Sequence, residues 1–212
     1  MEAIDLESIR CFVFDFGMTL SSDLYFKVAP EGCPQWQEIV EKLLFEEEEI
    51  DLWMEGQMSW REFAALVVEK TGLDEEIVED HLKKGLRGLS LNEEVANLAR
   101  VQRENGNATV LVTGNIDLFT EIVVPDLELR RMFDVIVNSA DYREGRKEIL
   151  WPIAFDLLDT AVTYDQCLLI EDSPKNVELF RRLGGRAYQY SDAAAFAVWL
   201  ADAGLHEGTN AA

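Results

Sequence analysis

Four short apolar runs constrain the fold of this 212-residue chain more than any other feature. They cover residues 11–14, 109–112, 135–137 and 167–170. Such short runs, without polar alternation, are typical of strands in a parallel sheet, because both faces of that sheet are covered. Helical patterns occupy residues 149–158 and 174–183, between or after the later runs. We therefore expect an α/β fold built on a doubly wound, Rossmann-like parallel sheet.

The first two runs are separated by residues 15–108, far more chain than one crossover helix needs. This segment holds several helical patterns. They are residues 36–54, a helix that opens with the capping box Ser59–Glu62 and ends near Thr71-Gly72, another from Asp74, and a last one from Asn92 to Asn105-Gly106. We predict a core domain formed by residues 1–20 and 92–205, a helical insert at 21–91 after the first strand, and a flexible tail at 206–212.

Charge separates the insert from the rest of the chain. The formal net charge is −22, which argues against nucleic acid or an anionic membrane as a partner. Residues 37–82 alone carry 15 acidic and 3 basic residues. We interpret the acidic run at residues 46–49 as a solvated helix face. Trp36, Trp53 and Trp60 are expected in the core of the insert or its seam with the main domain, with substrate contact by one of them as the alternative.

Histidines and cysteines narrow the possible chemistry. His81 and His206 are the only histidines in the sequence, which excludes a multi-histidine metal site and disfavours a Ser-His-Asp triad. Cys11, Cys33 and Cys167 show no paired metal-ligand spacing, and their odd number indicates reduced thiols. The first residues are acidic and no apolar run approaches the length of a membrane span. We expect a cytoplasmic protein, monomeric or homodimeric.

Polar side chains stand directly after three of the apolar runs. Asp15 follows the first run, Thr113 the second, and Glu171-Asp172 the last. The carboxyl ends of parallel strands meet at one edge of the sheet, where open α/β folds bind their ligands. Carboxylates buried there are costly unless they are paired or bound to a cation. Each of these residues alone could simply form a turn, but together they predict a site for a hard cation such as Mg²⁺.

Four segments around these residues resemble the motifs of the haloacid dehalogenase (HAD)-like superfamily. Residues 11–20 (CFVFDFGMTL) are similar to its first motif, an aspartate after a hydrophobic strand with Thr-Leu following. Residues 110–115 (VLVTGN) resemble the second motif, in which a hydroxyl residue ends a strand. Residues 145–147 (GRK) resemble the third, whose lysine precedes a helix, and residues 168–176 (LLIEDSPKN) the fourth, in its acidic-pair form. The four come in the family's order and span nearly the whole chain.

The resemblance is to the phosphatase branch, and it implies a role for each matching residue. Asp15 would attack phosphorus and form an aspartyl-phosphate that water then hydrolyses. Thr113 would hydrogen-bond a phosphoryl oxygen, and Lys147 would neutralise the charge between nucleophile and phosphate. The implied cofactor is Mg²⁺. Its ligands would be the Asp15 carboxylate, the backbone carbonyl of Gly17 and Asp172, with Glu171 behind them or bound through water.

Neighbouring residues complete the expected site. Gly114 and Asn115, next to Thr113, are expected to contact the substrate. Arg146 is expected to do so as well, because Arg143, Arg146 and Lys147 form the clearly basic patch near the motifs. Capping and loop geometry explain Ser173 and Asn176, with Ser173 as N-cap and Pro174 at the first helical position, and Lys175 is expected at the surface.

Gly17 is the main departure from the family pattern. Most phosphatases of the family carry a second aspartate there, which protonates the leaving group and later activates water. Three interpretations stay open: another group or water supplies the proton, the enzyme suits substrates with good leaving groups, or the protein binds phosphate without catalysis. A mutase is disfavoured by the missing acid, and a dehalogenase by the retained acidic pair. Asp23 is a candidate to return a carboxylate to the site. Glu148, where the family commonly has proline, changes how the next helix starts.

The insert lies where the family's helical C1-type cap belongs. Its pattern Trp53-x-x-Gly56-x-x-Ser59-x-x-x-Phe63 is similar to the branch with glucose-1-phosphatase-like and flavin-mononucleotide-phosphatase-like members. Such caps close over small substrates. The sequence therefore predicts a Mg²⁺-dependent phosphomonoester hydrolase that acts on a small phosphorylated metabolite. The alternative is a catalytically weak or silent protein of the same fold that binds a phosphometabolite or a protein partner.

Overall fold

The computed structural model describes residues 8–45 and 49–205 of the chain. The predicted tail at 206–212, His206 and Glu46–Glu48 of the acidic run lie outside the described residues. Within the described residues, no helix is long and apolar enough to cross a lipid bilayer.

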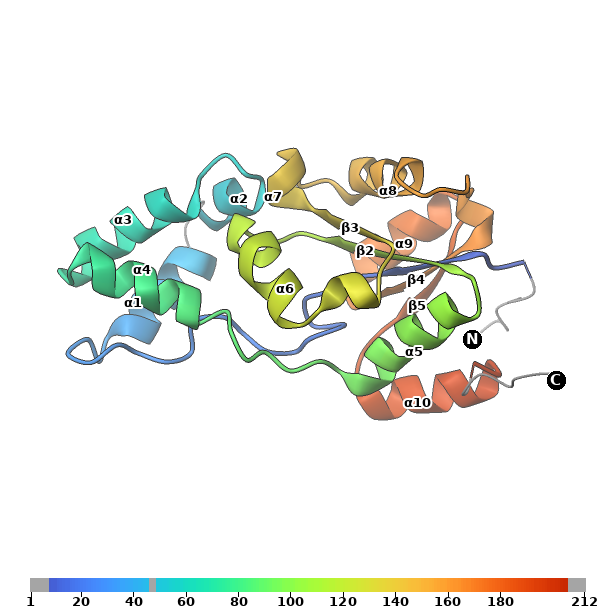
Figure 1. Cartoon of the computed structure of the whole chain (residues 1–212), viewed down its shortest axis with the longest axis horizontal. Helices are drawn as coiled ribbons and strands as arrows, with labels where there is room; N and C mark the ends of the chain where they lie inside the picture. Colours follow the sequence, from blue (N-terminus) through green and yellow to red (C-terminus); the bar gives the residue numbers. More distant parts are fainter. Residues whose placement is uncertain (1–7, 46–48, 206–212) are drawn as a thin grey trace.

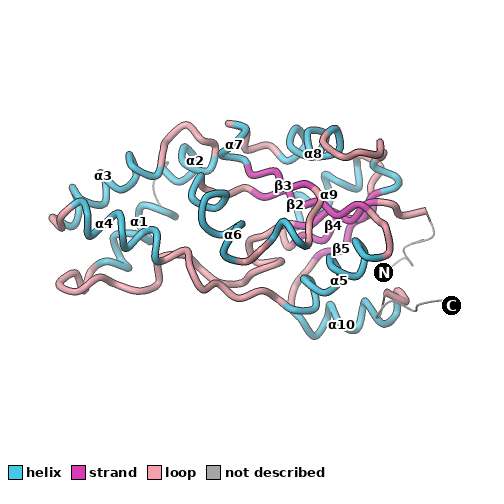
Figure 2. Tube along the Cα trace, in the orientation of Figure 1, coloured by secondary structure: helices cyan, strands magenta, loops and turns pink. Residues whose placement is uncertain are grey.

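A five-stranded parallel sheet forms the centre of one half of the molecule (Figure 2). Its strands are β1 (Cys11–Phe14), β2 (Ala108–Thr113), β3 (Val135–Asn138), β4 (Cys167–Glu171) and β5 (Arg186–Gln189). Their order is β3-β2-β1-β4-β5, and every neighbouring pair is parallel. This confirms the doubly wound sheet predicted from the apolar runs. Because the chain fills positions on both sides of β1, the switch point of strand order lies between β1 and β4.

Helices connect and cover these strands. They are α1 (Trp36–Phe45), α2 (Glu49–Met54), α3 (Trp60–Thr71), α4 (Glu75–Lys84), α5 (Glu93–Glu104), α6 (Val124–Asp126), α7 (Ser139–Tyr142), α8 (Lys147–Asp156), α9 (Pro174–Arg182) and α10 (Ala193–Asp202). A π-helical stretch, η1 (Phe119–Val123), runs into α6, and the short 3₁₀ turns η2 (Leu129–Arg131) and η3 (Tyr164–Gln166) precede β3 and β4.

Side chains of β1 alternate between two apolar layers, as the period of a strand requires. Cys11 and Val13 pack with buried residues of α8 and α9 on one face. Phe12 and Phe14 pack on the other face, where α5 and α10 lie (Figure 1). Both faces of the sheet are therefore covered, which explains why the strands read as continuous apolar runs.

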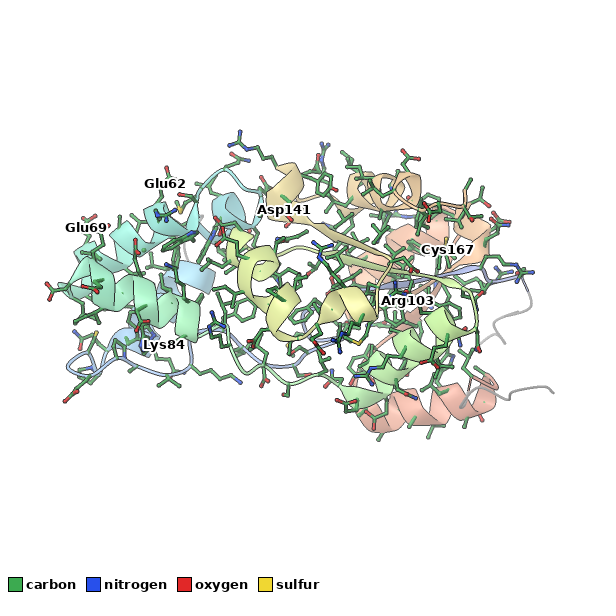
Figure 3. The ribbon with its side chains drawn as sticks, in the orientation of Figure 1. Glu62, Glu69, Lys84, Arg103, Asp141 and Cys167 are labelled. Carbon is green, nitrogen blue, oxygen red and sulfur yellow. The ribbon has the colours of Figure 1, made fainter. Side chains whose placement is uncertain are left out.

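Helices α1 to α4 all come from residues 21–91. Helices α1, α3 and α4 gather at one end of the molecule, and α2 lies between them and α7 (Figure 1). The predicted capping box is present: Ser59 Oγ accepts from the backbone N–H of Glu62, and the Glu62 side chain accepts from the N–H of Ser59. Gly72 ends α3 in the left-handed conformation, which suits glycine. The exposed side chains Glu62 and Glu69 project from the outer side of α3 (Figure 3). The predicted helical stretch 36–54 forms two helices, α1 and α2.

The two chain segments that connect the sheet to these helices are bonded to each other. The N–H of Asn92 donates to the Leu20 carbonyl at 2.8 Å, and Asn92 Nδ2 donates to the Thr19 carbonyl at 2.5 Å. Asp23 Oδ2 accepts from the backbone N–H and the hydroxyl of Ser90, at 2.7 and 2.6 Å. These bonds lie at the predicted limits of the insert, residues 21 and 91. The division of the chain into core and cap domains stays a proposal.

The insert also contacts the sheet half through its own helices. Asp117 Oδ1 accepts from the indole N–H of Trp53 at 2.7 Å, and Asp117 Oδ2 accepts from the backbone N–H of Trp60 at 3.0 Å. Ser139 Oγ donates to the Met54 carbonyl at 2.5 Å, where α2 lies beside α7 (Figure 1). These bonds hold the insert down on the sheet half.

The three tryptophans of the insert fall into packing positions. Trp53 stacks on Phe63 with 4.1 Å between the ring centroids, and both are fully buried. Trp36 is fully buried and donates its indole N–H to the Phe26 carbonyl. Trp60 lies beneath Lys83, whose Nζ is 4.1 Å from the ring centroid. These positions agree with a role in the core of the insert and in its seam with the sheet half.

Candidate active site

Asp15 and Lys147 form a buried ion pair at the carboxyl end of the sheet. Asp15 directly follows β1, and its backbone N–H donates to the Ile170 carbonyl of β4. Lys147 is the first residue of α8, so this helix begins two residues before the predicted stretch. Its Nζ lies 2.6 Å from Asp15 Oδ1 and also donates to the Val112 carbonyl at 2.5 Å. Only about a tenth of each side chain is exposed, 10% for Lys147 and 11% for Asp15.

Glu171 and Asp172 bring two more carboxylates to the same place. Glu171 ends β4, is 1% exposed, and has Oε2 at 3.8 Å from the Lys147 ammonium. Asp172 Oδ1 accepts from the Thr19 hydroxyl at 3.5 Å. Asp15, Glu171 and Asp172 each offer a carboxylate oxygen, and these oxygens all lie within 4.8 Å of one another. We call these three residues the carboxylate cluster.

Residues after β4 hold Glu171 in place. Its Oε1 accepts from the Ser173 N–H at 3.0 Å, and its Oε2 accepts from Asn176 Nδ2 at 3.1 Å. Ser173 is also the N-cap of α9, where its hydroxyl accepts from the Asn176 N–H. Ser173 and Asn176 thus combine the expected capping with a contact to the cluster, and Lys175 is exposed as expected.

Burial and mutual repulsion raise the pKa values of Asp15 and Glu171. Loss of hydration raises the pKa of Glu171 to about 8, the Asp15 carboxylate adds to the rise, and Lys147 opposes it. Burial also raises the pKa of Asp15, against the effect of the Lys147 ammonium, and Asp172 adds repulsion. One ammonium faces three carboxylates. The cluster therefore fits a divalent cation, because hard oxygen donors and excess negative charge are what Mg²⁺ binds.

The loop after β2 begins at the same edge of the sheet, because β2 is the neighbour of β1 on the side away from β4. Thr113 ends β2 and is 1% exposed, as the second motif predicts. Asn115 is 7% exposed, and its N–H donor is bonded to Ser139 Oγ at 2.9 Å. Its side chain exchanges hydrogen bonds with the Tyr25 hydroxyl, at 2.9 and 3.2 Å. Tyr25 was not expected from the sequence, because its partner lies 90 positions away and only the folded insert brings them together.

A tight turn follows Asp15. The N–H of Ser21 donates to the Phe16 carbonyl at 2.9 Å, and Met18 adopts a left-handed conformation with φ 55°. Gly17 lies in this turn, and a Cβ placed on it would meet no atom within 4 Å. Thr19 lies at its end, fully buried, and reaches Asp172 across the site. The turn therefore presents backbone, and no acidic side chain, at the position of the family's second aspartate.

A cavity of about 440 Å³ opens beside this turn. Gly17, Gly114 and Asn115 line its inner end, so it adjoins the residues that follow Asp15 and Thr113. Phe16, Met18 and Ile116 line it as well, and the insert supplies the other residues of the wall, from 23–27, α1 and α2. The cavity thus lies between the insert and the sheet half, beside the turn that follows Asp15.

Arg146 and Asp23 have partners of their own. The Arg146 guanidinium forms two bonds with Glu144, at 2.9 and 2.8 Å, and this holds the pKa of the Glu144 carboxyl down at about 2. Substrate binding by Arg146 stays a prediction. Asp23 lines the cavity but is engaged with Ser90 and Lys27.

Comparisons with known proteins support this picture at the level of the fold. No family model matches the sequence, and no curated protein matches it either. Solved structures do. A predicted HAD-like family hydrolase from Porphyromonas gingivalis is similar with a TM-score of 0.70 and 18% identity, covering 95% of this chain and 100% of that one.

Two further solved structures have a similar fold. A HAD family enzyme from Bacteroides thetaiotaomicron, in complex with magnesium and inorganic phosphate, has a TM-score of 0.63 and 16% identity, covering 86% of this chain and 94% of that one. The L-2-haloacid dehalogenase from Xanthobacter autotrophicus has a TM-score of 0.63 and 16% identity, covering 91% and 82%. The chain therefore has the fold of the HAD-like superfamily. Since the neighbours include dehalogenases, the reaction has to be argued from the site.

Proposed function

We propose that this protein is a Mg²⁺-dependent phosphomonoester hydrolase that acts on a small organic phosphate through an aspartyl-phosphate on Asp15. The observation that carries the proposal is the carboxylate cluster beside the Lys147 ammonium. A dehalogenase of this fold would gain nothing from two buried carboxylates and a half-buried third facing one lysine. The magnesium–phosphate complex of the Bacteroides enzyme adds support from the same fold.

The roles of the chain's own residues follow from their positions. Asp15 Oδ attacks phosphorus, the bond from phosphorus to the ester oxygen breaks, and water later cleaves the aspartyl-phosphate to phosphate and free Asp15. Lys147 neutralises charge between the carboxylate and the phosphoryl group, and its bond to the Val112 carbonyl fixes its position. Thr113 and the Gly114 backbone orient the phosphoryl oxygens. Mg²⁺, held by Asp15, Asp172, the Gly17 carbonyl and Glu171, would stabilise the charge that develops on phosphoryl oxygens.

Hydrolysis of p-nitrophenyl phosphate tests the proposal directly. We expect wild-type protein to release nitrophenol with Mg²⁺ and to lose this activity with EDTA. Asp15→Asn should reduce turnover to background while keeping the fold. Asp156→Asn, an exposed residue at the end of α8, is the matched control and should behave as wild type. Equal background rates for wild type and Asp15→Asn at every Mg²⁺ concentration would contradict the proposal.

A phosphate-binding protein without catalysis is the second candidate, and Gly17 is the observation that favours it. The same proteins separate the two candidates by calorimetry. Phosphate binding in the presence of Mg²⁺, with no Asp15-dependent turnover of any ester, would support the binding protein.

A further inference from the structure

The cavity beside Gly17 has a mainly apolar wall. Its side chains come from the segment after β1, from helices of the insert and from the loop after β2. They include Leu24, Phe26, Val40, Ile50, Met54 and Ile116. A volume of about 440 Å³ is within the common range for small-molecule sites. A cavity of about 150 Å³ already accepts benzene, so this one has room for a substituted ring or for two fused rings.

Two apolar side chains on this wall are unusually exposed. Met18 is 53% exposed and Leu24 is 52% exposed, and both line the cavity. Apolar side chains held at the mouth of a site lose unfavourable contact with water when an apolar ligand covers them. Met18 is fixed there by its left-handed backbone in the turn after Asp15. These two residues indicate an apolar group in the bound substrate.

Polar groups on the wall are already engaged. Asp23 bonds to Ser90 and pairs with Lys27 at 3.3 Å, and Asn115 bonds to the Tyr25 hydroxyl. The other polar side chains along the wall are Gln37 and Asp51. A sugar would have to bury several hydroxyls against apolar atoms here, and each buried hydroxyl without a partner costs binding free energy. The Asp51 carboxylate also repels a substrate with a second anionic group, whereas the charge of Asp23 is compensated by Lys27.

Gly17 supplies an independent argument about the leaving group. It lies two residues after Asp15 and lines the cavity, and it has no side chain to protonate an ester oxygen. General acid catalysis is worth about 10²–10⁴ in rate, and an alkoxide needs that proton to leave. A phenolate is a much weaker base and leaves without it. The group that fits the cavity and the group that can leave are therefore the same: an aromatic ring attached through oxygen.

We infer that the substrate is an aryl phosphate whose uncharged ring occupies this cavity. This inference rests on the proposed function. Asp15 Oδ forms a bond to phosphorus, the bond from phosphorus to the phenolic oxygen breaks, and the phenolate takes its proton from water. Water then attacks the aspartyl-phosphate, which releases phosphate and restores the Asp15 carboxylate.

Four esters test separately the two parts of the inference, which are the phenolic leaving group and the uncharged ring in the cavity. Phenyl and benzyl phosphate both carry a ring, but only phenyl phosphate has a phenolic leaving group. We expect kcat/KM for phenyl phosphate to be higher by at least about 100-fold, which is the lower limit of the rate factor that a general acid typically contributes. 2-Naphthyl phosphate and O-phosphotyrosine have similar leaving groups, but the second carries charges. We expect the naphthyl ester to be preferred by about tenfold or more, the factor for burying one aromatic ring.

Substitutions on α2 test whether the ring occupies the cavity. Ile50→Asp places a carboxylate on the wall, and it should reduce kcat/KM for 2-naphthyl phosphate by about tenfold or more. Acetyl phosphate, a small acyl phosphate with a good leaving group and no ring, should lose much less of its rate in this variant. Leu52→Asp is the matched control, because Leu52 is 39% exposed on the same helix and is absent from the cavity wall. Equal losses for both variants would overturn the placement of the ring.

Tyr25→Phe tests the absence of a proton donor, since Tyr25 carries a hydroxyl on the wall. We expect the steep dependence on the leaving group to be the same in the variant. A flat dependence in wild type that becomes steep in Tyr25→Phe would identify Tyr25 as the donor and overturn the inference. Preference for glucose 6-phosphate over every aryl ester would also overturn it, while the proposed function would stand. Loss of Asp15-dependent hydrolysis for all esters would remove both.

Discussion

Replacing Lys147 by methionine tests how the cluster is stabilised. The Lys147 ammonium lies 2.6 Å from Asp15 and 3.8 Å from Glu171, and about nine-tenths of its side chain is buried. Methionine keeps most of the buried length and removes the charge. Removing one partner of a buried ion pair typically costs about 3–5 kcal/mol, because the other charge is left without compensation. For a chain of this size, that loss lowers the melting temperature by about 6–20 °C.

The pH dependence of this loss can be derived from the pKa shift of Glu171. Its pKa rises from an ordinary value of 4.5 to about 8 in the folded chain. Between these values the folded state holds a proton that the unfolded state has released, so wild-type stability falls as pH rises through this window. Without Lys147 the pKa is raised further and the fall is steeper. Lys147→Met should therefore cost most at pH 8 and least near pH 5, where a proton neutralises the Glu171 carboxylate.

Urea unfolding followed by circular dichroism at pH 5 and pH 8, with EDTA present, measures both effects. Lys175→Met is the matched control, because Lys175 is exposed on the adjacent α9. Added Mg²⁺ should recover part of the stability of Lys147→Met at pH 8. The reasoning is refuted if Lys147→Met is as stable as wild type at pH 8 without Mg²⁺, or if its loss is the same at both pH values.

Three further predictions concern the cation, the turn and the seam. Mg²⁺ binding at pH 7 should release a proton from the cluster, because the pKa of Glu171 is about 8. Calorimetry in two buffers with different heats of ionisation measures this proton release. Equal heats of binding in the two buffers would contradict the prediction. Gly17→Asp has open space for its side chain. It should speed hydrolysis of benzyl phosphate by up to about 10²-fold while changing hydrolysis of phenyl phosphate little. If the ratio of the kcat values for the two esters is unchanged, the result counts against a missing acid. Gly56→Ala should lower the free energy of unfolding, measured in urea, by about 1–3 kcal/mol, because the new Cβ would lie 2.2 Å from the Ala140 carbonyl oxygen. Gly88→Ala is the control: Gly88 has a similar positive φ and no close neighbour, so this substitution should cost less.

The sheet could be predicted from sequence where burial on both faces leaves a mark. The apolar runs locate β1 to β4 to within a residue or two at each end. Strand β5 (Arg186–Gln189) was not predicted, because it lies at the edge of the sheet and its terminal residues are polar and less buried. The π-helical stretch before α6 was also missed, since no cap or periodicity announces it.

The residues of the site also fall into those that the sequence could predict and those that it could not. Asp15, Thr113, Glu171 and Asp172 could be found because each stands at the end of a strand, and parallel strands bring their ends to one edge. Tyr25 and the apolar wall could not be found. Their positions depend on how the insert folds back over the sheet, through bonds such as Trp53 to Asp117 that no local pattern encodes.

One apolar cluster runs without interruption from the sheet into the helices of the insert, from Phe12 and Phe14 through Phe16 and Phe26 to Trp53. Its members lose their packing partners together, so the chain should melt as one cooperative unit. A shortened chain that joined residue 20 directly to residue 92 would expose the apolar surface of the sheet half that the insert covers. We expect such a chain to precipitate. If the insert were exchanged between relatives, its apolar contact residues would likewise have to match those of the new sheet half. The two connecting segments would have to match as well.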